Sequence, residues 1–231
     1  MVYNWPLRLL RRLLPCHCRL CQAPDPSDLG LCAGCLNDLP GLTSACCRCA
    51  LPLAPQHGDP ICGACQSRPP AFDRCIALFP YAPPLDSLLL QLKFGQAVHL
   101  ARLFATLLAA RVQSEALPDC ILPVPLHPGR QRERGFNQAI EIARPLARRL
   151  GCALDLETCV RIRATPSQSR ISAQQRRHNL RGAFTLTRAP ARHIALLDDV
   201  MTTGSTLNEL AMLLRRNGAE RIDVWVCART V

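Results

Sequence analysis

The chain has 231 residues, 48% of them hydrophobic, and a net charge of +11. This composition supports a packed core and excludes wholesale disorder, and the length suffices for one medium domain plus a small one. No apolar run approaches the roughly 20 residues that a bilayer-spanning helix needs, so we predict no membrane span.

The first fifteen residues, "MVYNWPLRLLRRLLP", are basic and rich in leucine. Arg8, Arg11 and Arg12 interrupt the apolar residues, and no small-residue cleavage site follows, which argues against a signal peptide. We expect a short helical segment over 1–15 that docks on the body of the protein. Contact with a membrane surface is the alternative.

Cysteines dominate the next segment: ten of the fifteen lie before Arg68. Eight of them form four C-x-x-C pairs, separated by ten, ten and twelve residues. Two thiolates on one tight turn bind a tetrahedral ion, and two such turns complete its shell. The pattern therefore predicts two structural zinc ions and a reducing, cytoplasmic compartment. The predicted ligands are Cys18, Cys21, Cys32, Cys35, Cys46, Cys49, Cys62 and Cys65.

The spacing leaves the pairing of these turns open. Sequential pairing would give a double zinc ribbon over residues 16–70, whereas a cross-braced arrangement would join alternate pairs. Redox chemistry or chance pairing is the alternative to zinc. A shell closed by four thiolates has no position for substrate, so we interpret this module as structural.

From about residue 72 the chain alternates helix-like and strand-like segments. Amphipathic periodicity predicts helices over 83–94, 99–112 and 206–219, and a helix over 135–151 that ends at a glycine and contains Pro145. Apolar runs predict strands over 120–126, 193–200 and 221–229. The long polar stretch 164–181 predicts a mobile loop or lid. Strands alternating with helices indicate an α/β domain over 72–231, with a mostly parallel sheet flanked by helices.

The stretch "LLDDVMTTGSTL" at 196–207 places two acids at the end of a predicted strand and a hydroxyl-rich turn directly after them. Ligands bind beyond the carboxyl ends of parallel strands. A turn that opens a helix favours phosphate there, and Gly204 allows close backbone approach. A ribose 5-phosphate fits both halves: its diol on Asp198 and Asp199, its phosphate on Thr202, Thr203, Gly204, Ser205 and Thr206. A solvated corner followed by a helix cap is the alternative.

The positive charge is concentrated between residues 127 and 192, a segment that contains 14 arginines and only four acidic residues. This excess predicts a polyanionic partner, either the phosphates of a small molecule or nucleic acid. Only Phe136 and Phe184 among the aromatic residues lie in this segment, so a platform for stacking single-stranded bases would be thin.

The acid pair and turn resemble the signature of type I phosphoribosyltransferases, and the whole chain resembles the ComF family of competence-associated, GntX-like proteins. In that family a zinc segment precedes a phosphoribosyltransferase-like domain. The resemblance runs from about Cys16 to Val231. It rests on the four cysteine pairs and on "PPAFDR", "LKF", "PVPLHPGRQRERGFNQA", "ATPSQSR", "RRHNLRGAF" and "VWVCART".

The resemblance implies a function and assigns roles to residues. It implies binding of phosphoribosyl pyrophosphate with Mg2+, transfer of the phosphoribosyl group to an acceptor, and a link to DNA uptake. Asp198 and Asp199 would hold the ribose, and the 164–181 loop would close over the site. A homodimer is plausible from the relatives. The candidate partners of the pyrophosphate and lid are Lys93, Arg130, Arg132, Arg134, Arg176 and Arg177.

One departure from the resemblance narrows the acceptor. Transferases of 6-oxopurines carry an aspartate at the first position of the phosphate turn, and this chain has Thr202 there. The carboxylate that handles the proton of the base is therefore absent, which argues against purine salvage. The rival hypothesis is a non-catalytic protein that senses a nucleotide or binds single-stranded DNA during DNA uptake.

Overall fold

The computed structural model describes residues 16–231 except 26, 28, 56–59, 95–96 and 165–181. The predicted 1–15 segment and most of the predicted lid, with Arg176 and Arg177, therefore lie outside the described residues. Among the helices of the described ranges, none combines the length and the apolar character needed to cross a bilayer.

A five-stranded sheet with only parallel pairings forms the centre of the structure, in the order β1-β7-β6-β2-β3. The predicted strand over 120–126 is shorter than expected and ends at Pro123. The edge strand β1, which pairs with β7, was not predicted. The strands are β1 (Arg74–Pro80), β2 (Cys120–Pro123), β3 (Ala153–Leu154), β6 (His193–Met201) and β7 (Arg221–Arg229). A separate antiparallel pair joins β4 (Cys159–Arg161) to β5 (Phe184–Leu186).

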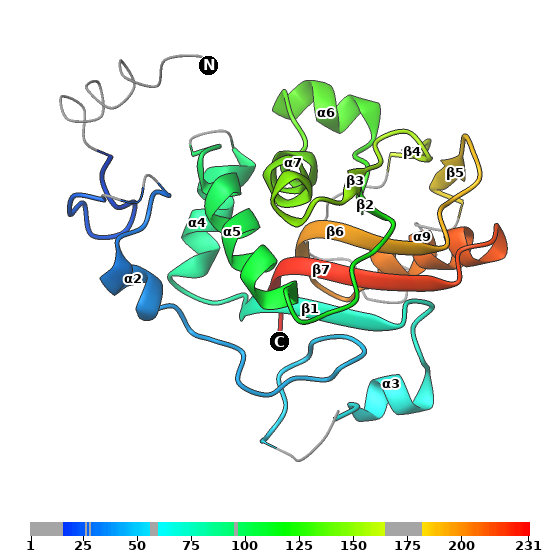
Figure 1. Cartoon of the computed structure of the whole chain (residues 1–231), viewed down its shortest axis with the longest axis horizontal. Coiled ribbons are helices and arrows are strands. Elements are labelled where there is room, and N and C mark those ends of the chain that lie inside the picture. Colours follow the sequence, from blue (N-terminus) through cyan, green and yellow to red (C-terminus); the bar gives the residue numbers. More distant parts are fainter. Residues whose placement is uncertain (1–15, 26, 28, 56–59, 95–96, 165–181) are drawn as a thin grey trace.

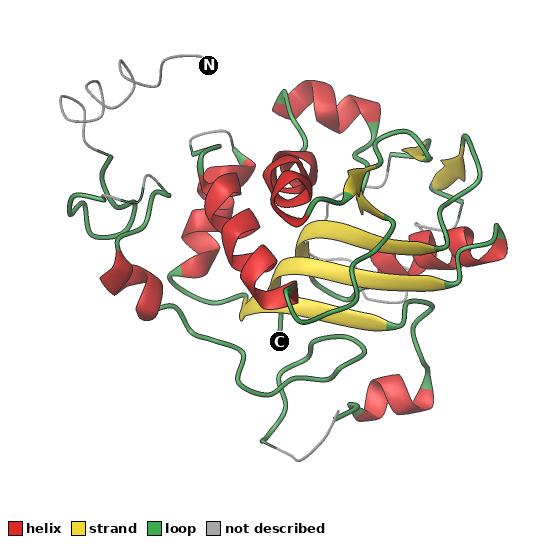
Figure 2. Ribbon diagram, in the orientation of Figure 1, coloured by secondary structure: helices red, strands yellow, loops and turns green. Residues whose placement is uncertain are grey.

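Helices cover both faces of this sheet (Figures 1 and 2). The helices α4 (Leu85–Lys93), α5 (Leu100–Val112) and α7 (Gln138–Leu150) lie on one face, and α9 (Ser205–Arg216) lies on the other. The four predicted helices are thus present. Three short helices, α2 (Ala33–Asn37), α3 (Gly63–Ser67) and α6 (Pro128–Arg134), were not predicted.

Local caps fix where α7 starts and ends. The side chain of Asn137 accepts a hydrogen bond from the Ala139 N–H at 3.0 Å, and its amide donates to the Val124 carbonyl at 3.0 Å. The start of the helix is thereby tied to the segment that follows β2. At the other end, Gly151 adopts a φ of 69°, a left-handed conformation that suits glycine and stops the helix.

The alternation of side chains along β6 divides the interior into two cores. Ala195 and Leu197 pack with α4, α5 and α7, whereas Ile194 and Leu196 pack with α9. The two cysteine segments join different cores. Leu31 and Leu39 belong to the first core, and the thiols of Cys46, Cys49, Cys62 and Cys65 belong to the second.

The α4 helix offers a matched test of the first core. Leu88 is fully buried, whereas Leu90, two residues along the same helix, is 44% exposed. We expect Leu88→Ala to lower the free energy of unfolding by about 2–5 kcal/mol, because it removes buried methyl groups and leaves a cavity. Leu90→Ala should cost at most about 1 kcal/mol. Urea denaturation followed by circular dichroism measures both, and equal losses would contradict the assignment of the core.

Candidate functional site

The acid pair lies at the carboxyl end of a central strand. Asp198 and Asp199 belong to β6, which lies between β7 and β2, and the chain then turns through Thr202–Gly204 into α9. The sequence predicted this strand–turn–helix order. The carboxyl edge of a parallel sheet is where the ends of neighbouring strands can contribute to one site.

The turn presents hydrogen-bond donors at the start of α9. Gly204 has a φ of 73°, a left-handed conformation that side chains rarely adopt, and a Cβ on it would also displace the flexible end of the Met201 side chain. The hydroxyls of Thr203 and Ser205 lie 2.8 Å apart. Within the described residues, the backbone N–H groups of Thr203 and Gly204 make no hydrogen bond. These donors and the helix N-terminus together form an arrangement suited to an anion.

The electrostatics of the acid pair differ from those of ordinary surface carboxylates. Burial raises the pKa of Asp198 well above its usual value, and the charge of Asp199 raises it further, while Lys93 acts in the opposite direction. The N–H of Asp199 donates to the Asp198 carboxylate at 2.9 Å, and the N–H of Val200 donates to Asp199 at 2.8 Å. The pair therefore favours hydroxyl donors or a cation as partners.

The structure brings some of the predicted cations to this site. Lys93 is close enough to lower the pKa of Asp198, and its contact with pyrophosphate stays a prediction. Burial lowers the pKa of Arg161, the charge of Arg130 lowers it further, and the charge of Asp198 raises it, so all three side chains lie near one another. The two other arginines of α6 are less involved: Arg134 donates to Gln138 at 3.3 Å, and Arg132 is exposed.

Sequence reasoning missed two residues near the acids and the turn. Arg161 ends β4 and lies 5.5 Å from the centre of the Phe184 ring on β5. Arg229 ends β7 directly beside Met201 of β6 and donates to the Thr202 carbonyl. No local pattern marks Arg161. The edge rule for parallel sheets could have identified Arg229, because it ends a predicted strand beside the acid pair's strand.

The eight predicted cysteine ligands form two groups of four. Cys18, Cys21, Cys32 and Cys35 make one, and Cys46, Cys49, Cys62 and Cys65 the other. Within each group all sulfur atoms lie within 4.8 Å of one another. The pairing is therefore sequential, and the cross-braced alternative is wrong. One sulfur pair in each group is 3.6 Å apart, close to the edge of about 3.8 Å of a tetrahedron with Zn–S bonds of about 2.3 Å. The geometry fits zinc.

The thiols within each group differ in pKa, and therefore in how readily they form the thiolate that binds metal. Burial alone would raise the pKa of Cys18, but backbone N–H groups more than offset it and lower the pKa to about 6. The same balance lowers the pKa of Cys46 to about 7. Metal binds the thiolate form, so each group contains one thiol that ionises readily. Cys16, His17 and Cys47 lie outside both groups.

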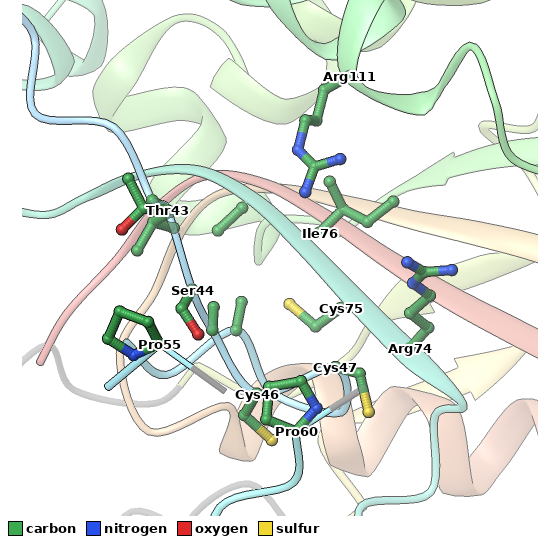
Figure 3. Close-up of a pocket in the computed structure, with 14 residues that line it drawn as sticks. Thr43, Ser44, Cys46, Cys47, Pro55, Pro60, Arg74, Cys75, Ile76 and Arg111 are labelled. Atoms are coloured by element: carbon green, nitrogen blue, oxygen red, sulfur yellow. The ribbon is translucent and has the colours of Figure 1, made fainter. Parts of the chain in front are cut away.

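Two cavities adjoin the second group. The larger, about 280 Å³, is lined by residues 42–47, Ala50, Pro55 and Pro60 and by residues 74–77 of β1, and Figure 3 shows Arg74 and Arg111 at its wall with Thr43 and Ser44. The smaller, about 160 Å³, lies between the second cysteine group and the turn, and its lining includes Cys65, Thr203 and Ser205.

The protein is of the class that joins two N-terminal four-cysteine units to a mostly parallel α/β domain, here with an acid pair and a hydroxyl-rich turn at the carboxyl edge of the sheet. The chain is 42% identical to DNA utilization protein YhgH of Salmonella typhimurium over 227 residues, 94% of this chain and 99% of the relative. It is 38% identical to Competence protein F of Haemophilus influenzae, over 87% of this chain and 90% of the relative. The chain therefore belongs to the family of these proteins, the ComF family that its motifs resemble.

Two other comparisons add little. No family model matches the chain. Among solved structures, it is similar to glutamine phosphoribosylpyrophosphate amidotransferase from B. subtilis, with a TM-score of 0.38, 19% identity, and coverage of 55% of this chain and 25% of that chain. Adenine phosphoribosyltransferase from Leishmania tarentolae gives a TM-score of 0.37 at 13% identity, with 59% and 73% covered. Likenesses at these scores carry no argument about activity.

The metal content tests the two cysteine groups. We expect purified wild-type protein to hold two zinc ions per chain, one in each group. Cys21→Ser and Cys62→Ser should each reduce the content to about one, because each removes a ligand from a closed shell. Cys152→Ser, outside both groups, is the control and should leave the content unchanged. Elemental analysis after gel filtration measures the content, and a wild-type protein without zinc would contradict the assignment.

The raised pKa of Asp198 predicts how stability depends on pH. A group with a raised native pKa contributes its full stability below the unfolded pKa, and this contribution is lost as pH rises through the native pKa. Asp198→Asn should therefore melt at a higher temperature than wild type at about pH 8, with a smaller gain at about pH 5.

Asp155 provides the opposite control. Burial would raise its pKa, but hydrogen bonds from Thr158, Glu157 and Arg188 prevail and lower it. Asp155→Asn should therefore melt below wild type at about pH 8, and the deficit should shrink as the pH falls through the lowered native pKa. Two variants that shift the melting temperature in the same direction at neutral pH would refute the electrostatic account.

Proposed function

We propose that the chain binds phosphoribosyl pyrophosphate with Mg2+ at the carboxyl end of β6 and transfers its phosphoribosyl group to an acceptor. One observation carries this proposal: a half-buried acid pair and a hydroxyl-rich turn that opens a helix are separated by only two residues of chain, Val200 and Met201. A ligand that satisfies both must present hydroxyls beside a phosphate. The ribose 5-phosphate part of this substrate does so.

Each part of the site has a distinct task in this proposal. The turn, from Thr202 to Thr206, holds the 5-phosphate with backbone and hydroxyl donors. The carboxylates of Asp198 and Asp199 accept hydrogen bonds from the ribose hydroxyls and fix the sugar. Their oxygens also suit Mg2+, which when bound would offset the charge of the pyrophosphate.

Charge development decides which residues matter for transfer. When pyrophosphate leaves C1, positive character develops on the ribose and negative charge on the leaving group. The fixed carboxylates stabilise the first, and cations beside the acid pair stabilise the second. Lys93, Arg130 and Arg161 are supported for this task by their charges acting at or near Asp198. Arg132, Arg134, Arg176 and Arg177 stay predictions from the sequence.

The turn restricts the class of acceptor that we propose. Thr202 occupies the position where a 6-oxopurine transferase would carry an aspartate, so we propose an acceptor other than a 6-oxopurine.

The organisation of the chain is part of this proposal. A segment over 1–15 precedes a double zinc ribbon over 16–70, and 72–231 is the transferase-like domain. We propose a cytoplasmic location, because reduced thiolates are needed to hold zinc, and a homodimer as the functional state.

A second candidate function is binding of single-stranded DNA without turnover. Four exposed arginines on α6 and α7 favour it, and the relatives are named for DNA utilization and competence. Contacts to phosphates alone would make such binding salt-sensitive and indifferent to sequence. The four arginines are Arg132, Arg144, Arg148 and Arg149.

Calorimetry tests the pocket directly. Wild-type protein should bind phosphoribosyl pyrophosphate, and removal of Mg2+ should weaken the binding. The double variant Asp198→Asn/Asp199→Asn should lose roughly tenfold to a hundredfold in affinity, because it removes charged hydrogen-bond acceptors. Asp86→Asn, in the first turn of α4, is the matched control and should bind like wild type. Equal affinity in the double variant would defeat the site assignment.

Turnover separates the two candidate functions. Release of pyrophosphate across a panel of bases and amines would support transfer, whereas intact ligand binding without release would favour a sensor. For DNA, Arg148→Gln/Arg149→Gln should weaken binding of single strands and reduce its salt dependence. Unchanged binding would place DNA elsewhere.

A further inference from the structure

Arg229 joins two parts of the molecule that are far apart in the sequence. It is the last residue of β7, and its side chain is buried, at 9% exposure. Its Nε donates to the Cys49 carbonyl at 2.9 Å. Its Nη1 donates to the Thr202 carbonyl and, at 3.4 Å, to the Met201 carbonyl. One guanidinium therefore bridges the second four-cysteine unit and the phosphate turn.

The charge of Arg229 is not compensated by a nearby acid. Its hydrogen-bond acceptors are carbonyls and one hydroxyl, and no carboxylate in the described part of the chain forms an ion pair with it. A zinc ion held by the four thiolates of the second unit would leave that unit with a net negative charge, which would attract the guanidinium of Arg229. The positive charge beside the turn adds to the potential that attracts an anion there.

The second four-cysteine unit has further contacts to the end of β6. The N–H of Cys75 donates to the Cys47 carbonyl at 3.0 Å, and its Sγ lies 3.7 Å from the Sδ of Met201. Met201 in turn packs against Gly204. Elsewhere a cavity of about 160 Å³ lies between the unit and the turn, so these contacts and those of Arg229 join the two.

The first four-cysteine unit is placed differently. Leu31 and Leu39 from its segment pack into the core with α4 and α5, and Gly30 lies against His99. Figure 1 shows α2, from this unit, beside α4, while the segment leading to α3 passes below β1. The two units have the same ligand set but different neighbours, so their effects on the turn need not be equal.

We propose that Arg229 is a positioning residue that couples the second four-cysteine unit to the phosphate turn, with the first unit uncoupled. Zinc in the second unit holds the Cys49 loop, Arg229 carries that order to the Thr202 carbonyl, and the turn is thereby pre-arranged for phosphate. The ligand part of this inference rests on the proposed function. Linkage makes the effect reciprocal: a ligand on the turn should also retain metal in the second unit.

Substitution of Arg229 is the first test. Arg229→Met should raise the dissociation constant for phosphoribosyl pyrophosphate at least about tenfold, and Arg229→Lys should fall between it and wild type, since lysine keeps the charge but not the fork. Arg188→Met is the control, because Arg188 also makes several hydrogen bonds, to Asp155, Glu157 and Thr158 instead. Folded Arg229→Met protein that binds within about twofold of wild type would overturn the proposal.

Zinc release is the second test and needs no substitution of Arg229. In Cys21→Ser protein, which should keep only the second zinc, phosphoribosyl pyrophosphate with saturating Mg2+ should slow zinc loss to a zinc-selective chelator by at least about fivefold. In Cys62→Ser protein, which should keep only the first zinc, the ligand should leave the rate unchanged. Equal slowing in both proteins, or none in the first, would overturn the coupling.

Hydrogen exchange separates failure of this inference from failure of the proposed function. Without any ligand, the amides of 202–206 should exchange faster in Arg229→Met and Cys62→Ser than in wild type, and unchanged in Cys21→Ser. A wild-type protein that binds no phosphoribosyl pyrophosphate but shows this pattern refutes the proposed ligand and keeps the coupling. Identical exchange in all four proteins refutes the coupling itself.

Discussion

The parallel register of β6 with its two neighbours is the constraint on which the rest of the structure depends. Leu197 pairs with Pro123 on one side and Trp225 on the other, so the next two residues, both acidic, arrive together at the carboxyl edge. The same register places Met201 beside Arg229. If β6 shifted by one residue relative to its neighbours, each acidic side chain would move to the other face of the sheet. Met201 would then no longer pair with Arg229.

The half-buried Asp198 at this edge opposes the stability of the fold. The raised pKa of Asp198 means that ionising it in place is costly, and Asp199 beside it adds repulsion. A core optimised only for stability would carry an apolar or amide residue at this position. Arg229 lies beside the turn at the same edge, and within the described residues it forms no ion pair with a carboxylate. The edge thus presents negative charge at the acid pair and positive charge at Arg229. A ligand with hydroxyl groups beside an anionic group would complement both.

Local patterns in the sequence predicted the elements that local physics determines. The periodicity of α5, the apolar run of β6 and the C-x-x-C turns all depend on neighbours a few residues away, and the structure contains them. Contacts distant in sequence were not predictable from such patterns. The sequential cysteine pairing stayed open because the spacings of both arrangements are alike. Arg161 was missed because its place near Asp198 depends on the β4–β5 pair, which has no strong periodicity.

The two four-cysteine units also show why identical chemistry need not mean identical roles. A shell closed by four thiolates cannot take a substrate, so either unit can influence the site only through the positions of the residues that it holds. The first unit packs against helices of one core, whereas the thiols of the second are part of the core beneath α9. Within the described residues, only the second unit is joined to the turn by one side chain: Arg229 donates to the Cys49 carbonyl and to the Thr202 carbonyl. The second four-cysteine unit and the turn after β6 are therefore joined directly at that point, although most of the chain separates them in sequence.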